Sequence, residues 1–391
     1  MVKKKKEDPI EEFFKSFVSA DNEADFKFGH EVFAQTPEVI STSSLVLDDA
    51  LSAGGLPKGR IIQYYGKAAS GKSLNAMLAI KEAQKENLKA RQIWIDAEGS
   101  FDGSWAENLG IDLERIFIVE KDTAVYGQKL FELLLGIPKE DKKHKFAGKS
   151  KEGMLDNIAN GKLNINMIVL DSLGAVLSPG LDTAFVGQVT IGKNANFYTQ
   201  IFPKLSIEVK KANVPFVVIN HVKDGMDPYG PDHSYSGGNA YTHHLSANVY
   251  FYMSRSKDAS ILDEHGDRVG GIITATVEKS KFGPHPKKCE FKVDFRTGIV
   301  ELEEQVAELA IKYGIIKKTS KVSYEYGDEK WVGQNKVSEA IRDNQELFTE
   351  LKTKVEEARL NKITQKIAEQ EQRKQELMES EEEELETEET V

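Results

Sequence analysis

The sequence predicts an α/β fold: a core built on a central, mostly parallel sheet, with a short helical segment before it and a small α+β domain after it. From residue 40 onward, short apolar runs such as RIIQYYG, ARQIWID and NINMIVLD alternate with helix-length segments. Continuous apolar runs indicate strands buried on both faces, as in parallel sheets. A glycine-rich segment follows one of these runs directly, and acidic residues end two others. Ligand sites in parallel sheets lie at such strand ends.

Changes of pattern along the chain predict four segments. Residues 1–39 hold one amphipathic helical stretch at 10–19, which is too short to bury a core alone. Residues 40–299 form the core, and its strands after residue 246 follow one another without helices, which indicates an antiparallel extension. Residues 300–360 predict a small domain with helices at 305–313 and 336–357 around a polar hairpin. Residues 361–391 predict a charged, acidic, disordered tail.

Composition narrows the class of protein. The 391 residues are 40% hydrophobic, enough for one large core with smaller satellites. The single cysteine, Cys289, excludes a disulfide framework. No apolar stretch approaches the ~20 residues of a membrane span, and the start MVKKKKEDPIEEFF lacks the apolar run of a signal peptide. We therefore expect a cytoplasmic protein with no membrane partner, in the host cytoplasm if the chain is viral.

The net charge of −11 is concentrated at the C-terminus. Residues 369–391 hold eleven glutamates against Arg373 and Lys374, which accounts for nine of the eleven excess negative charges. The remainder of the chain is close to neutral. The bulk charge therefore says little about what the folded part binds.

A complete G-x4-G-K-S pattern lies between a strand and a helix. Its backbone N–H groups are expected to wrap the phosphates of ATP, while Lys72 reaches the β- and γ-phosphates and Ser73 binds Mg²⁺. The pattern consists of Gly66, Lys67, Ala68, Ala69, Ser70, Gly71, Lys72 and Ser73.

Two further strands end in acidic residues. Asp171, followed by Ser172, ends the run NINMIVLDS and is the expected second Mg²⁺ anchor. Glu98 follows the run ARQIWID, where a carboxylate could orient and deprotonate an attacking water. An exposed cap or a salt-bridge partner would occupy the same place, and spacing alone does not decide between these roles.

On these and other motifs the chain resembles the RecA family from about residue 40 to about 358. Similar segments are ISTSSL leading through AGGLPKGR to the glycine-rich loop, GGNA at 237–240, and YGDEKWVGQNK at 326–336. The resemblance implies a RecA-like P-loop ATPase core, with residues 1–39 as a polymerisation segment. It implies an ATP-dependent recombinase that forms helical filaments on single-stranded DNA and promotes pairing and strand exchange with homologous duplex DNA. Single-strand-binding proteins and mediator proteins are further partners that the resemblance allows.

The resemblance also assigns roles at the nucleotide. Glu98 takes the catalytic glutamate role beside Lys72, and Ser172 joins the nucleotide contacts. Asp102 and Trp105 match positions that contact and stack on adenine, although Trp105 could equally be a half-buried core aromatic. Asn220 and His221 match a polar pair that senses the γ-phosphate. Bacterial RecA typically has glutamine at the second place, and histidine there is similar to the phage UvsX-like branch.

Three further elements are implied by position in the family pattern. Lys279 and Lys281 match paired lysines that reach the γ-phosphate of a neighbouring subunit, whereas without the family context they would read as a solvated strand face. Residues 185–193 and 222–236 match two DNA-binding loops, which an ordinary surface loop would resemble in composition. The expected DNA-binding residues are Phe185, Gly187, Lys193, Lys223, Met226, Tyr229, Tyr235, Gly237, Gly238 and Asn239.

Two other classes of protein share the P-loop and sheet. A ring-forming helicase should lack the paired strand lysines and the C-terminal domain, and it would form hexameric rings rather than filaments. A protein-binding ATPase of the circadian-clock type would not need DNA loops, and single-stranded DNA would not stimulate its hydrolysis.

Overall fold

The computed structural model describes residues 37–137, 151–179, 181, 193–224, 233–235 and 240–388. The chain divides into two units, Pro37–Arg359 and a second one made of Met1–Thr36 with Leu360–Val391. The helix expected at 10–19 lies outside the described residues. The larger unit contains every element that positions the candidate site.

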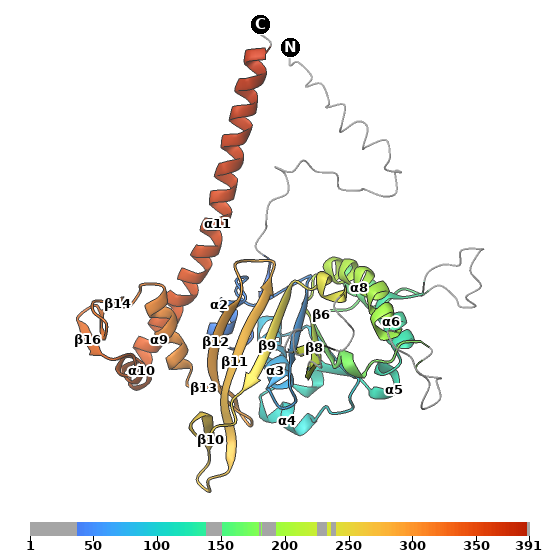
Figure 1. The fold of residues 1–391 in the computed structure, drawn as a ribbon, viewed down its shortest axis with the longest axis horizontal. Coiled ribbons are helices and arrows are strands. Elements are labelled where there is room, and N and C mark those ends of the chain that lie inside the picture. The colour runs from blue at the N-terminus through green and yellow to red at the C-terminus, as the bar shows by residue number, and fades with distance from the viewer. Residues whose placement is uncertain are drawn as a thin grey trace. The chain divides into compact units, whose positions relative to one another are not determined.

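The fold is α/β, and its main sheet is mostly parallel, as predicted (Figure 1). Its strand order is β13-β12-β11-β9-β3-β7-β6-β4-β5. The parallel strands are β5 (Ile116–Val119), β4 (Arg91–Asp96), β6 (Ile165–Asp171), β7 (Phe216–Asp224), β3 (Ile61–Gly66) and β9 (Ala247–Met253). The antiparallel extension comprises β11 (Arg268–Ser280), β12 (Lys287–Asp294) and β13 (Gly298–Val300). It begins one strand later than predicted, because β9 still runs parallel to β3.

Helices cover both faces of this sheet, which explains why its strands are apolar on both sides. Along β6, Met167 and Val169 belong to one hydrophobic cluster and Ile168 and Leu170 to another. The first cluster includes α2 (Leu45–Ala50), α3 (Lys72–Glu86) and α4 (Gly103–Asn108). The second includes α5 (Lys121–Ala124), α6 (Gly127–Leu135), α7 (Met154–Ala159) and α8 (Lys193–Ala212).

The C-terminal elements of the larger unit pack on the first face. They are α9 (Leu302–Lys312), the sheet of β14 (Lys317–Lys318), β15 (Ser323–Tyr326) and β16 (Glu329–Val332), α10 (Gln334–Asp343) and the start of α11 (Gln345–Glu388). Val306, Leu309, Ile341 and Val355 are buried in the same cluster as the core residues. This small α+β region therefore shares its hydrophobic core with the main sheet.

The predicted helix 336–357 is divided in two at Asn344. This residue has an extended backbone, and its side-chain oxygen accepts hydrogen bonds from the N–H groups of Glu346 and Leu347, both at 3.1 Å. Asparagine in this position caps the new helix.

The expected disordered tail also differs from the structure, in which α11 continues to Glu388. Residues 345–388 contain no glycine or proline and are rich in Glu, Gln, Lys and Leu, all strong helix formers. High charge suppresses a core, which is what the composition indicated, but it does not prevent a helix from forming.

Two aspartates of α2 join the core to the C-terminal elements. Asp48 is fully buried and accepts hydrogen bonds from Ser41 and Thr42, while Arg359 lies 3.7 Å from it. Asp49 pairs with Lys312 and Tyr313 of the α9 region. Burial raises the pKa of Asp48 from 3.8 to about 6.

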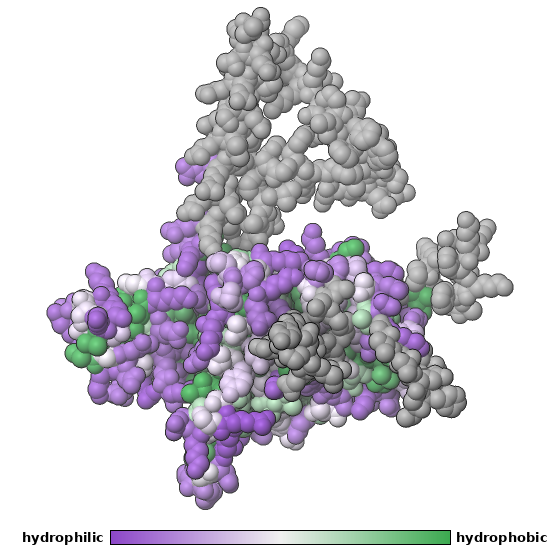
Figure 2. All heavy atoms as spheres, viewed as in Figure 1, coloured by the Kyte–Doolittle hydropathy of each residue, from purple (hydrophilic) through white to green (hydrophobic). Residues whose placement is uncertain are grey.

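The described surface visible in Figure 2 is mostly hydrophilic, with apolar residues in small, separate patches. Such scattered patches are normal for a folded protein. None of the helices in the described ranges is long and apolar enough to cross a membrane.

We predict that Asp48→Asn makes the free energy of unfolding less dependent on pH between pH 4 and 7. The native pKa of Asp48 lies above its ordinary value, so between pH 4 and 6 the folded state holds a proton that the unfolded state releases. Stability from this group is complete below pH 4 and is lost as pH rises through 6, by on the order of 2–3 kcal/mol. Urea unfolding of both proteins at pH 4, 5, 6 and 7 measures it. Parallel curves for the wild type and the variant would contradict this account of Asp48.

Candidate nucleotide-binding and catalytic site

The glycine-rich loop connects the end of β3 to the start of α3. Gly66 and Gly71 adopt φ values of 155° and 91°, which favour glycine, and a Cβ at Gly66 would lie 2.3 Å from the carbonyl oxygen of Phe251. Gly71 begins the 15-residue helix α3 without a side-chain cap. The first N–H groups of α3 are therefore open to an anionic ligand.

The loop already surrounds a buried cation. The Lys72 ammonium donates to the carbonyl oxygens of Gly66 at 3.1 Å and Lys67 at 2.8 Å, and burial lowers the pKa of Lys72. The Ser70 hydroxyl oxygen is buried, and among the described residues it has no hydrogen-bond partner. A phosphate group would satisfy both, so these residues fit the triphosphate of ATP.

Ser73 and Asp171, the two residues expected to bind Mg²⁺, lie side by side. The Ser73 hydroxyl donates to a carboxylate oxygen of Asp171 at 2.7 Å, which joins the first turn of α3 to the end of β6. Burial raises the pKa of Asp171 to about 6. A buried carboxylate beside a hydroxyl fits Mg²⁺, which binds oxygen ligands and would stabilise the ionised carboxylate.

Glu98 meets two donors from neighbouring strands. Its Oε1 accepts a hydrogen bond from the Ser172 hydroxyl, and it lies 2.8 Å from Nε2 of His221. The His221 contact, together with Ser172, lowers the pKa of Glu98 to about 2. Glu98 is therefore ionised at neutral pH, and its Oε1 is held by both donors.

Asp96 shapes the loop that carries Glu98, a role that the sequence analysis missed. Its carboxylate accepts hydrogen bonds from the N–H groups of Gly99, Ser100 and Phe101 at 2.8–3.0 Å. The N–H of Glu98 also donates to the carbonyl of Asp171. An aspartate followed by a glycine three residues later is typical of this kind of turn, and that signal was present in the sequence.

The expected phosphate-sensing pair is divided between two environments. Asn220 is fully buried and donates to the Tyr241 hydroxyl at 2.8 Å, while its oxygen accepts from the N–H of His221. Only His221 turns toward Glu98. Asn220 thus holds the backbone that positions His221.

Asp102 and Trp105 are both held by contacts within the chain. Asp102 caps α4 by accepting a hydrogen bond from the N–H of Trp105 at 3.1 Å. The Trp105 indole donates to the carbonyl of Phe295 at 2.5 Å and packs against the first cluster. These contacts favour the half-buried core aromatic, and adenine stacking stays a prediction.

Lys279 and Lys281 lie at the opposite end of the sheet from the P-loop. Ser280 of β11 pairs with Ala247 of β9, which pairs with Ile62 of β3. The P-loop begins four residues further along β3, about 13 Å away at the rise of a strand. Burial, and for Lys279 the charge of Lys281, lowers the pKa of both lysines. Neither ammonium group pairs with a carboxylate in the part of the chain that the structure describes.

Most of the expected DNA-binding residues lie outside the described residues, namely Phe185, Gly187, Met226, Tyr229, Gly237, Gly238 and Asn239. Lys193 is exposed at the start of α8. Lys223 and Tyr235 belong to a hairpin in which β7 pairs with β8 (His233–Tyr235). This hairpin extends directly from His221.

Comparison with known proteins agrees with this geometry. A model of the RecA N-terminal domain matches residues 8–137. A curated relative named Protein RecA, from Porphyromonas gingivalis, is 32% identical over 327 residues, which cover 83% of this chain and 86% of the relative. Proteins of the same name from Aquifex aeolicus and Wolinella succinogenes are each 30% identical, over 324 and 320 residues. Those two matches cover 82% and 81% of this chain and 84% and 81% of the relatives.

We predict that Lys72→Ala weakens the binding of a fluorescent ATP analogue by at least about tenfold, because a charge-assisted contact to phosphate is lost. Lys85→Ala, on the exposed end of the same helix, is the matched control and should bind like the wild type. Melting curves of both variants show whether the fold is kept. Equal affinities of a folded Lys72→Ala variant and the control would refute the site.

Proposed function

The chain belongs to the RecA family, and on that premise we propose which of its residues carry the activity. It is an ATP-dependent DNA recombinase and a DNA-dependent ATPase that uses Mg²⁺. It assembles into filaments on single-stranded DNA and promotes pairing and strand exchange with homologous duplex DNA. The observation that carries the site assignment is the convergence of Lys72, the Ser73–Asp171 pair and Glu98. We further propose that the protein works in the cytoplasm.

The P-loop residues bind and orient the triphosphate in this proposal. Lys72 exchanges the carbonyl oxygens of the loop for phosphate oxygens, which offsets their charge at a helix N-terminus. Ser73 and Asp171 would hold Mg²⁺, which supplies further charge neutralisation at the phosphates. The present contacts of Lys72 support this role, because its ammonium group already donates to carbonyl oxygens of the loop.

Glu98 is the proposed general base, and His221 controls it. While His221 and Ser172 hold Oε1, Glu98 is ionised but only weakly basic, because its pKa is about 2. When His221 turns to the γ-phosphate, Glu98 loses its main stabilising contact and its pKa rises toward the ordinary value. A base whose pKa lies nearer the working pH accepts a proton from water more readily.

The same histidine links the nucleotide to DNA. His221 is part of β7, and β7 continues without interruption into the hairpin with β8. The proposed second DNA loop contains this hairpin. A displacement of His221 is therefore passed along a continuous strand to the DNA-binding segment.

We predict that Glu98→Gln forms filaments with ATP and single-stranded DNA while hydrolysis falls by about 10²–10⁴-fold, because an amide fills the space but accepts no proton. Glu107→Gln, on the exposed side of α4, is the matched control. Electron microscopy with single-stranded DNA and ATP records assembly, and phosphate release records turnover. Near wild-type turnover would make Glu98 a structural residue, and rings in place of filaments would favour a helicase.

We predict that Lys279→Ala subunits lose DNA-stimulated hydrolysis but regain part of it when mixed with Glu98→Gln subunits. The register of the sheet keeps Lys279 away from the P-loop of its own chain. In an equal mixture about a quarter of the interfaces unite an intact Glu98 with an intact Lys279. Lys288→Ala on β12 is the control and should stay active alone. No recovery on mixing would mean that Lys279 does not act across the interface.

A further inference from the structure

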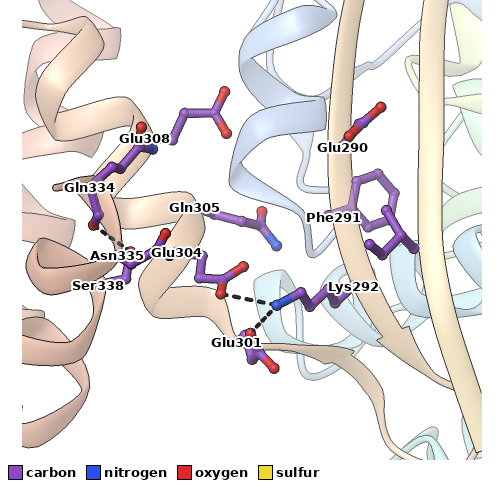
Figure 3. A pocket seen from close by; sticks show the side chains of 11 residues that line it. Glu290, Phe291, Lys292, Glu301, Glu304, Gln305, Glu308, Gln334, Asn335 and Ser338 are labelled. Carbon is purple, nitrogen blue, oxygen red and sulfur yellow. Dashed lines mark hydrogen bonds and ion pairs between the residues drawn. The ribbon is translucent and has the colours of Figure 1, made fainter. Parts of the chain in front are cut away.

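A hollow of about 370 Å³ separates strand β12 from helices α9 and α10, away from the nucleotide site. Figure 3 shows side chains from all three elements turned toward it. In the order of the sheet, β12 is three strands away from β3 and further from β7 and β6. A ligand in this hollow would therefore not touch the P-loop, Asp171 or His221. The hollow is large enough for a small ligand or a few residues of a peptide.

The lining of the hollow is strongly acidic. Glu290, Glu301, Glu304 and Glu308 face it, and Lys292 is the one cation among its lining residues. Lys292 is shared by Glu301 and Glu304, the latter at 3.0 Å. Glu308 has no ion pair or hydrogen bond in the described part of the chain, and desolvation raises its pKa. Glu290 pairs with Lys288 at 3.0 Å, and Glu301 also lies 3.7 Å from Arg342. Of the four glutamates, Glu308 is therefore the one without an ion pair in the described part of the chain.

A second and independent observation concerns Gln305, on the same helix. Its side chain is 97% buried, and its Oε1 accepts hydrogen bonds from the Ser44 hydroxyl at 2.9 Å and the N–H of Val46 at 3.3 Å. Its amide nitrogen has no acceptor among the described residues. Rotating the amide would leave the N–H of Val46 without its acceptor, so the observed orientation is favoured and leaves a buried donor of Gln305 without a partner.

Together these features define the chemistry that a ligand of this hollow would need. It must carry positive charge for the glutamates and a hydrogen-bond acceptor for Gln305. A metal ion does not fit, since no group of three or more acidic, His or Cys side chains within the described ranges could hold one. DNA does not fit either, because its phosphates would be repelled. A peptide fits, since an arginine supplies a planar cation for carboxylates and the backbone supplies carbonyl acceptors.

We propose that the hollow between β12, α9 and α10 binds an arginine-bearing segment of a partner protein. The arginine pairs with Glu308, and a peptide carbonyl accepts the free hydrogen of Gln305. Gln334, Asn335 and Ser338 of α10 offer further hydrogen bonds to the peptide backbone. This site goes beyond the proposed function, because it adds a partner that is recognised apart from nucleotide and DNA.

The test uses the full chain and a capped, fluorescent peptide of sequence Gly-Arg-Ala-Arg-Gly. Fluorescence anisotropy is expected to show binding that Glu308→Gln weakens about tenfold, that Glu303→Gln on the same helix leaves unchanged, and that 0.5 M salt reduces. A citrulline peptide, which keeps the shape without the charge, should bind much more weakly. Single-stranded-DNA-stimulated hydrolysis should be equal in all three proteins, which separates this site from the ATPase site.

A photo-crosslinking version of the peptide locates the contact. Crosslinks on α9 and α10 are expected. Equal affinities of Glu308→Gln and Glu303→Gln, or crosslinks confined to residues 369–391, would overturn the proposal, because either result means that the peptide follows general acidity instead of this hollow. Failure of binding at millimolar peptide would overturn it as well.

Discussion

The parallel register of four central strands is the constraint on which the candidate site depends. Gly66 of β3 pairs with His221 of β7, and Asp96 of β4 pairs with Asp171 of β6. Because these strands are buried on both faces, charged groups are tolerated only where the strands end. Lys72, Asp171, Glu98 and His221 come from four separate stretches of sequence. All four lie near the carboxyl ends of the central parallel strands. A shift of register in any of the four strands would separate them.

The two carboxylates at these strand ends have pKa values that are shifted in opposite directions. Asp171 receives one hydrogen bond, from Ser73, and burial dominates, so its pKa rises to about 6. Glu98 receives two donors, and its pKa falls to about 2. When the environments of two neighbouring carboxylates shift their pKa values in opposite directions, the two groups commonly have different roles. Asp171 gains most from a bound cation, whereas Glu98 gains basicity only when its donors leave.

The parts of this arrangement that sequence could predict are those written in local patterns. The P-loop, Asp171 and the alternation of strands and helices are continuous motifs, and they predicted the fold and most of the residues proposed for the site. Asn220 shows the limit, because its contact with Tyr241 depends on packing between distant segments. The division of a predicted helix at Asn344 and the helix in place of a disordered tail both came from local propensities. The prediction missed both features because it followed the wider pattern of polar and apolar residues instead of these local propensities.

The two ends of the sheet carry complementary halves of the proposed active site, and this has a consequence for assembly. One end presents the P-loop and Glu98, and the other presents Lys279 and Lys281 at the end of β11. Two different surfaces of one chain can join only head to tail, and such contacts extend into a helix unless the rotation closes a ring. The two lysines repel each other in the isolated chain. If these lysines act as proposed, the phosphate of a neighbour would relieve that repulsion, and nucleotide binding and polymerisation would stabilise each other by the same contacts. On the same proposal, hydrolysis and release of phosphate would remove the shared anion and weaken the interface rather than either subunit.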